Sequence, residues 1–258
     1  PLEDVDVLVM DTDLTPDGGP TTASRQTFVT GNAARHAAIA LREAITAFLA
    51  EKYDHPPSTI NFEEGRVFIK GKSLTFSEIA REMTAAGKPP ITLYRYEAPT
   101  TQPLGTGGDM HFAYSFAAQA VHVEVNTETG EVSVLQVIAA TDVGTVINPL
   151  GLKGQIEGGV MMGIGHALTE EFVVDEGQIV TDRIARYKIP GIMMTPEITW
   201  IIVEQPTAEG PYGAKGVGEI SSIPTSPAIT NAIYNAVGVR IDRTPVDQAL
   251  IASKLQNN

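Results

Sequence analysis

The sequence predicts an α+β fold in which mixed sheets pack against helices. Short apolar runs that are typical of strands, such as Val67–Ile69 and Ile198–Val203, occur between longer segments whose apolar residues recur at helical spacing. A hairpin is the clearest local signal. Ala120–Asn126 and Val132–Ala139 alternate in polarity and flank the turn Thr127–Gly130.

The first part of the chain combines one apolar run with a long polar loop. Val5–Met10 is a near-continuous apolar run and predicts a buried strand. Residues 11–27 consist mainly of turn formers and small polar residues, so we expect an ordered loop there. Asn32 is expected to cap an alanine-rich helix that continues to about Glu51.

The next segment has weaker signals. Thr75 and Glu78 have the spacing of a capping box, which predicts a helix over Phe76–Ala86. Ile91–Tyr96 alternates in polarity and predicts a strand, and Gly105–Gly108 is expected to interrupt regular structure.

The C-terminal part contains two dense glycine blocks. In Asp142–Phe172, apolar residues from Ile156 to Leu168 have helical spacing. The interior glycines must therefore be compensated by close packing or by a ligand. Beyond the Gly210–Glu219 block, a helix is expected to begin near Pro224 and end near Val237, and a last helix to cover Val246–Leu255.

Composition excludes several classes of function. The chain has 258 residues, a net charge of −13 and no cysteine, so a basic nucleic-acid surface, disulfides and an iron–sulfur cluster on this chain are not expected. No apolar run approaches the ~20 residues of a membrane span. The first residues, starting at Pro1, resemble neither a signal peptide nor a natural start. We expect a cytoplasmic protein without a membrane span, and a fragment or split subunit of something larger.

Three glycine-rich blocks that also carry polar side chains suggest loops that converge on one ligand. Glycine lets backbone N–H groups approach a ligand, and the blocks offer neutral donors and acceptors together with one guanidinium, that of Arg25. Such chemistry suits a large, phosphate-bearing cofactor. Purely structural loops explain the same spacing equally well. The polar side chains in question are Thr22, Ser24, Arg25, Gln26, Asn148 and Gln155.

Glu219 is the candidate catalytic carboxylate. It follows Gly216-Val217-Gly218, which leaves it accessible, and it precedes a segment that would hold it rigidly. In the alternative interpretation it pairs with Lys215 or caps the next helix. No metal site is expected, because neither His111 nor His166 has a second ligand at metal spacing.

The blocks Thr21–Ala33, Asp142–Gly159 and Gly210–Glu219 resemble, in that order, the xanthine oxidase family of molybdenum hydroxylases. The resemblance spans nearly the whole chain. It implies that residues 1–258 form the C-terminal molybdopterin-binding region of the large subunit, without the N-terminal half. It also implies cofactor contacts from Thr21, Thr22, Ala23, Ser24, Arg25, Gln26, Asn148, Lys153, Gln155, Val217 and Gly218.

The same resemblance implies an oxidoreductase that inserts water-derived oxygen at an electron-poor carbon of an aldehyde, purine or N-heterocycle. The expected cofactor is molybdenum–molybdopterin in its cytosine dinucleotide form. Glu219 would be the proton-accepting base, in a largely desolvated pocket where burial raises its pKa. Expected partners are the N-terminal half of the molybdenum subunit on another chain, an iron–sulfur subunit, an FAD subunit and the small-molecule substrate. A noncatalytic cofactor-binding or assembly subunit remains the alternative.

Overall fold

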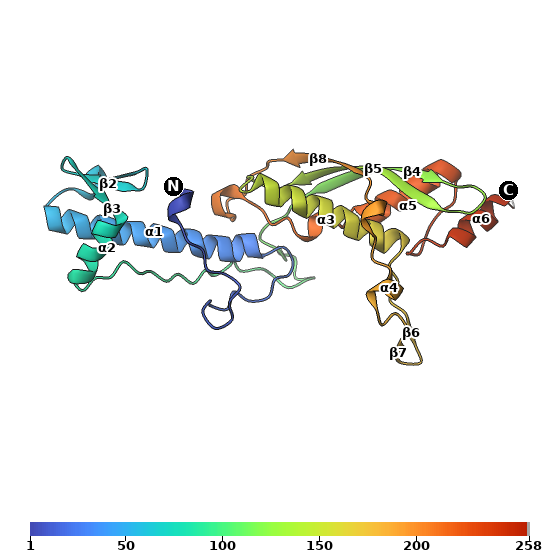
Figure 1. Cartoon of the computed structure of the whole chain (residues 1–258), viewed down its shortest axis with the longest axis horizontal. Coiled ribbons are helices and arrows are strands. Elements are labelled where there is room, and N and C mark those ends of the chain that lie inside the picture. Colours follow the sequence, from blue (N-terminus) through green and yellow to red (C-terminus); the bar gives the residue numbers. More distant parts are fainter. Residues whose placement is uncertain (257–258) are drawn as a thin grey trace. The chain divides into compact units, whose positions relative to one another are not determined.

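The computed structural model describes residues 1–256, and the chain forms two compact units (Figure 1). The first unit comprises residues 1–20 and 29–99, and the second comprises residues 21–28 and the chain from Thr100 onward. Helix α1 (Gln26–Tyr53) therefore has its first residues in the second unit and the rest in the first.

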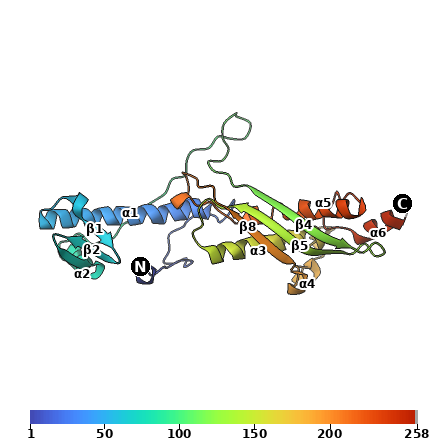
Figure 2. The ribbon, with the colours of Figure 1, turned by 90° about the horizontal axis from the view of Figure 1, so that it is seen from above.

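The first unit packs two helices against a small sheet (Figure 2). Strands β1 (Asn61–Glu63), β2 (Arg66–Ile69) and β3 (Lys72–Thr75) pair antiparallel in that order. Helix α2 (Phe76–Ala85) follows directly. The buried core consists of Ile45, Phe48, Leu49, Ile60, Val67, Ile69, Ile79 and Met83.

The predicted capping box at the start of α2 is confirmed. The Thr75 hydroxyl accepts the N–H of Glu78 at 3.2 Å, and the Glu78 carboxylate accepts the N–H of Thr75 at 2.8 Å. The backbone N–H of Thr75 thereby lowers the pKa of the Glu78 carboxyl. The predicted helix starts at the expected residue and ends one residue earlier than expected.

The second unit contains a mixed sheet with helices on one face (Figure 1). Strand β4 (Ala117–Val125) pairs antiparallel with β5 (Val132–Asp142), which pairs parallel with β8 (Glu197–Val203). Helices α3 (Pro149–Leu168) and α5 (Thr225–Val237) cover the face that carries Val137 and Ala139. The predicted hairpin, both helices and the mixed α+β class are confirmed.

Short elements complete the second unit. A hairpin of β6 (Val174–Asp175) and β7 (Gln178–Ile179) follows α3, and the last helix, α6 (Gln248–Gln256), matches the predicted C-terminal helix closely. The remaining short helices are η1 (Leu2–Asp4) and η2 (Pro57–Thr59) in the first unit, and α4 (Ile184–Tyr187), η3 (Ile192–Met194), η4 (Pro211–Gly213) and η5 (Glu219–Ser221) in the second.

Two predicted strands are wrong. Val5–Met10 forms no strand and its side chains are exposed, because no other described segment pairs with it. Ile91–Tyr96 is also unpaired. Its hydroxyl-bearing Thr92 bonds to the carbonyl of Ala37 on α1 at 2.9 Å, and the Tyr94 ring stacks on His36. The apolar side chains of Ile91 and Leu93 are exposed. The alternating polarity of this segment therefore comes from an extended segment that contacts α1 with every second residue, not from a strand in a sheet.

The predicted N-cap of α1 is also wrong. Asn32 lies inside the helix and is buried, whereas the helix begins at Gln26. Ala23 and Ser24 both have positive φ, and the N–H of Arg25 bonds to the carbonyl of Thr22 at 3.1 Å. Because of this tight turn, the polar loop ends before Gln26, whereas a cap at Asn32 would have placed the start of the helix several residues later.

Helix α3 packs against the start of α5 through glycine. A Cβ added at Gly159 would stand 2.5 Å from Ser221 Cβ, and one at Gly163 would stand 2.4 Å from Thr225 Cβ. Both distances are shorter than real carbon contacts allow. Close packing therefore compensates these two interior glycines.

Replacing Gly163 with alanine is expected to destabilise the chain by about 1–3 kcal/mol, because α5 would have to move away from α3. The measurement is urea unfolding of Gly163→Ala. Gly154→Ala is the matched control in the same helix, since nothing lies within 4 Å of its added Cβ. Alanine at 154 should be neutral or stabilising by up to about 1 kcal/mol. Equal effects at both positions would contradict the packing argument.

Candidate cofactor site

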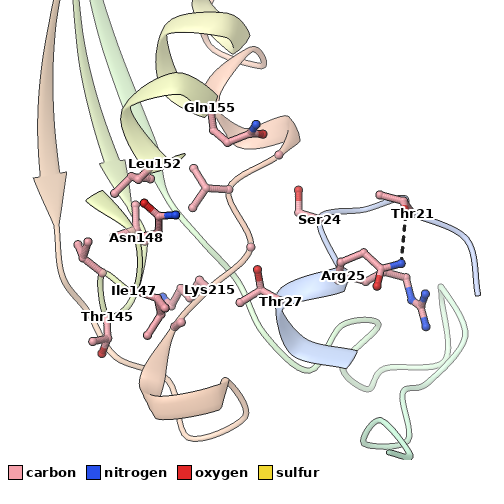
Figure 3. A pocket seen from close by; sticks show the side chains of 17 residues that line it. Thr21, Ser24, Arg25, Thr27, Thr145, Ile147, Asn148, Leu152, Gln155 and Lys215 are labelled. Atoms are coloured by element: carbon pink, nitrogen blue, oxygen red, sulfur yellow. Dashed lines mark hydrogen bonds between the residues drawn. The ribbon is translucent and has the colours of Figure 1, made fainter. Parts of the chain in front are cut away.

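A cavity of about 380 Å³ lies within the second unit, where three segments of the chain meet (Figure 3). The first segment is the turn that leads into α1, the second runs from the end of β5 into α3, and the third precedes η5. These are the three glycine-rich blocks of the sequence. The predicted residues that line the cavity are Thr21, Ser24, Arg25, Gln26, Asn148, Gln155, Val217 and Gly218.

Backbone hydrogen bonds hold the second and third segments together. The N–H of Lys215 bonds to the carbonyl of Val143 at 3.0 Å, and the N–H of Thr145 bonds to the carbonyl of Gly213 at 3.1 Å. The first and third segments are in direct contact. A Cβ added at Gly216 would stand 1.9 Å from the carbonyl oxygen of Ser24, so only glycine permits this approach.

Lys215 and Asp142 form a buried ion pair beside the cavity. Their Nζ and Oδ2 atoms are 2.6 Å apart, and the two side chains are only 6% and 5% exposed. Asp142 Oδ1 also accepts the N–H of Gly144 at 3.1 Å. The alternative interpretation of Glu219 as the partner of Lys215 is therefore wrong, because Lys215 pairs with Asp142.

Glu219 is the first residue of η5 and is bonded to the turn before α1. Its backbone N–H donates to Ser24 Oγ at 3.0 Å, and its Oε1 accepts the N–H of Ala23 at 3.2 Å. Glu219 does not cap α5, whose N-cap residue is Pro224. The largely desolvated pocket expected around Glu219 in the assembled subunit stays a prediction. The side chain is exposed, since no described segment covers the outer side of η5.

The predicted residues on α3 have different environments. Asn148 caps the helix through Oδ1, which accepts the N–H of Gly151 at 2.9 Å, and it also lines the cavity. Gln155 lines the cavity about two turns further along the helix (Figure 3). Lys153 does not line it; its Nζ lies 3.4 Å from Glu157 on the same helix.

Within the first segment, the side chains point in different directions. Figure 3 shows Ser24 and Thr27 on the side that faces α3, whereas the guanidinium of Arg25 extends away from Asn148 and Gln155. Gln26 Nε2 donates to Thr21 Oγ1 at 3.2 Å. Thr22 and Ala23 do not line the cavity, but Ala23 contacts Glu219 as described above.

Nine residues of the cavity lining were not predicted as cofactor contacts, among them two threonines and an isoleucine. Thr27, Thr145 and Ile147 line the cavity, and the segment between Thr145 and Asn148 is fixed by Glu204 at the end of β8, which accepts the N–H of Val146 at 2.8 Å. Thr145 and Ile147 lie in the second glycine-rich block, between its first residue, Asp142, and the predicted cofactor contact Asn148. Their position in that block is the signal that could have identified them.

The lining contains hydroxyl and amide groups, which suit a polar ligand. The Arg25 guanidinium points away from α3, and the Lys215 ammonium is paired with Asp142. At about 380 Å³ the cavity is near the lower end of the ~300–1,000 Å³ of small-molecule sites, so it accommodates one portion of a dinucleotide-sized cofactor. Among residues 1–256, no cluster of three or more His, Asp or Glu side chains could bind a metal ion directly.

Fold and site together define a cofactor-binding module assembled from three loops. The sequence model described as "Molybdopterin cofactor-binding domain" matches residues 1–196. The chain belongs to this family, which confirms the resemblance to molybdenum hydroxylases.

Two curated relatives illustrate the similarity. The chain is 34% identical over 98% of its length to 6-hydroxypseudooxynicotine dehydrogenase complex subunit gamma of Paenarthrobacter nicotinovorans, and covers 32% of that protein. It is also 30% identical over 95% of its length to the xanthine dehydrogenase molybdenum-binding subunit of Escherichia coli O157:H7, and covers 33% of that protein. The chain thus spans about a third of the length of these relatives.

Solved structures agree on the fold. The aldehyde oxidoreductase of Desulfovibrio desulfuricans is 31% identical, with a TM-score of 0.76 over 94% of this chain and 24% of that one. Quinoline 2-oxidoreductase of Pseudomonas putida is 27% identical, with a TM-score of 0.75 over 92% of this chain and 30% of that one. None of the helices in residues 1–256 is long and apolar enough to span a membrane.

Proposed function

We propose that this chain is the C-terminal, catalytic part of the molybdopterin-binding subunit of a hydroxylase or dehydrogenase. The observation that carries the proposal is the position of Glu219. Its carboxylate accepts the N–H of Ala23 and its backbone N–H donates to Ser24 Oγ, in the turn beside the cavity where the three loops meet. When bound, the molybdenum–molybdopterin group supplies the redox chemistry that hydroxylates an electron-poor carbon with oxygen from water.

The residues of this chain would divide two tasks between them. Ser24, Thr27, Asn148 and Gln155 offer hydrogen bonds that orient the cofactor. Glu219 would accept a proton at Oε2. Its Oε1 is fixed by the N–H of Ala23, while Oε2 makes no hydrogen bond within residues 1–256. A carboxylate held at one oxygen and open at the other is arranged to act as a base.

We further propose the cytosine dinucleotide form of the cofactor, with electrons leaving through iron–sulfur and FAD subunits. The absence of cysteine in this chain supports electron-transfer centres elsewhere. The share of the relatives that the chain covers supports a further polypeptide segment that completes the cofactor site, here proposed as the N-terminal half of the subunit. The substrate class is an aldehyde, a purine or an N-heterocycle, and we propose the cytoplasm as the location.

The test is metal and cofactor analysis of the purified complex, followed by an activity screen across the three substrate classes. We expect about one molybdenum per chain, release of cytidine monophosphate on acid hydrolysis, and turnover of one class. A complex without stoichiometric molybdenum would instead identify a noncatalytic assembly subunit. A cofactor without the nucleotide would overturn only the dinucleotide form.

Arg25→Ala and Gln155→Ala are expected to lower the molybdenum content of the complex at least severalfold while changing its melting temperature little. Both residues line the cavity rather than the apolar core, so they contribute to ligand binding more than to folding. Metal analysis and thermal unfolding of the same preparations test this.

Lys153→Ala is the matched control on α3. Because Lys153 pairs with Glu157 and lies outside the cavity lining, its replacement should leave the molybdenum content nearly unchanged. Loss of stability without loss of molybdenum at Arg25 or Gln155 would show that these side chains support the fold instead.

A further inference from the structure

Gln119 is a polar side chain on the face of β4 that packs against the helices. It pairs in the sheet with Ala139, a fully buried core residue, and its side chain reaches the segment that links η5 to α5. Nε2 of Gln119 donates to the carbonyl of Ser221 at 2.8 Å, and Oε1 accepts the hydroxyl of Thr225 at 2.7 Å. One amide therefore bonds to both ends of the segment 221–225.

The opposite side of this segment is in contact with α3. Ser221 and Thr225 are both 0% exposed, and they face Gly159 and Gly163, where even a methyl group would not fit. The segment is thus confined between the amide of Gln119 and the glycine surface of α3. Glu219 lies two residues before Ser221, in the same short helix.

The carbonyl of Ser221 depends on Gln119 for a good donor. A second donor, the Thr225 hydroxyl, lies 3.5 Å from that carbonyl. It lies only 2.7 Å from Gln119 Oε1, to which it donates. A buried carbonyl that loses its donor is costly, so η5 would move to find another partner. That movement would also disturb the bonds between Glu219 and the turn at Ala23 and Ser24.

We propose that Gln119 is a positioning residue for Glu219: by bonding to Ser221 and Thr225, it fixes η5 and so sets the place of the carboxylate at the cofactor site. This inference rests on the proposed role of Glu219 as the base. Gln119 itself does not line the cavity and would act only through η5.

The test compares Gln119→Met with Gln136→Met in the assembled, molybdenum-loaded complex. Methionine has a similar size but provides neither bond. Gln136 is the matched control, because it is half-buried on the opposite face of the same sheet and its side chain makes no hydrogen bond within residues 1–256. The measurements are hydrogen exchange of the amides in residues 219–223 and 21–25, molybdenum content, and turnover per molybdenum.

We expect Gln119→Met to increase amide exchange in residues 219–223 and to lower turnover per molybdenum, each by about tenfold. Molybdenum content and exchange elsewhere on β4 should not change, and Gln136→Met should behave like the native protein. If Gln119→Met does not assemble, Thr225→Val decides. Valine keeps the shape of the side chain but removes the hydroxyl that donates to the Gln119 amide oxygen. This variant should also increase amide exchange in residues 219–223 and lower turnover per molybdenum.

Two results separate failure of this inference from failure of the proposed function. If Glu219→Gln abolishes turnover but Gln119→Met turns over at the native rate, or leaves exchange in residues 219–223 unchanged, the positioning role is overturned and the base remains. If Glu219→Gln turns over normally, the base assignment fails and the positioning role fails with it, whatever the exchange data show.

Discussion

Replacing Glu219 with glutamine is expected to lower turnover per molybdenum by about 10²–10⁴-fold, the usual contribution of a positioned general base. Glutamine keeps the size of the side chain and can still accept the N–H of Ala23 through its amide oxygen. It cannot accept a proton at the position of Oε2. The cofactor should remain bound, because Glu219 does not line the cavity.

Molybdenum, pterin and turnover should be measured on one preparation of the variant. Glu197→Gln is the control, since Glu197 is an exposed carboxylate at the start of β8 and outside the cavity lining. We expect that variant to keep its full rate. Near-normal turnover per molybdenum in Glu219→Gln would refute the assignment, and lost stability with an intact rate would indicate a structural role.

Replacing Lys215 with methionine is expected to destabilise the chain by about 3–5 kcal/mol, the largest stability effect among these predictions. The replacement leaves Asp142 as an uncompensated charge in a site where its side chain is 5% exposed. The measurement is urea unfolding of the cofactor-free chain, so that ligand binding does not contribute to the result.

The control and the double variant distinguish the charge effect from lost packing. Lys153→Met removes an exposed i,i+4 pair with Glu157 and should cost only about 0.3–0.5 kcal/mol. In Asp142→Leu combined with Lys215→Met, both charges are gone, and stability should recover most of the loss. A double variant as unstable as Lys215→Met alone would show that packing, rather than the unpaired charge, causes the effect.

Elements that rest on local chemistry could be predicted from the sequence. The capping box at Thr75 and Glu78 and the hairpin around Gly130 depend on residues close together in the chain, and both are present. Elements that depend on a distant partner could not. Val5–Met10 has the composition of a strand, but a strand forms only where another segment pairs with it, and composition does not report that partner.

The candidate site shows the same division. The glycine-rich blocks indicated which loops converge, and these loops do line one cavity. The pairing of Lys215 could not be predicted, because its partner, Asp142, lies 73 residues away while Glu219 is close in sequence. The glycines before Glu219 predicted that it is accessible, and its side chain is exposed. A run of glycines before a carboxylate predicts access, but it does not predict how much of the surrounding surface this chain provides.

The bond between the N–H of Glu219 and Ser24 Oγ joins residues 195 positions apart. During synthesis from the N-terminus, the turn at Ser24 therefore emerges long before η5 can meet it. Closing so long a loop is entropically unfavourable until the sheet and helices of the second unit have brought its ends together. A nascent chain that ends before Glu219 therefore lacks the bond that joins η5 to the turn at Ser24.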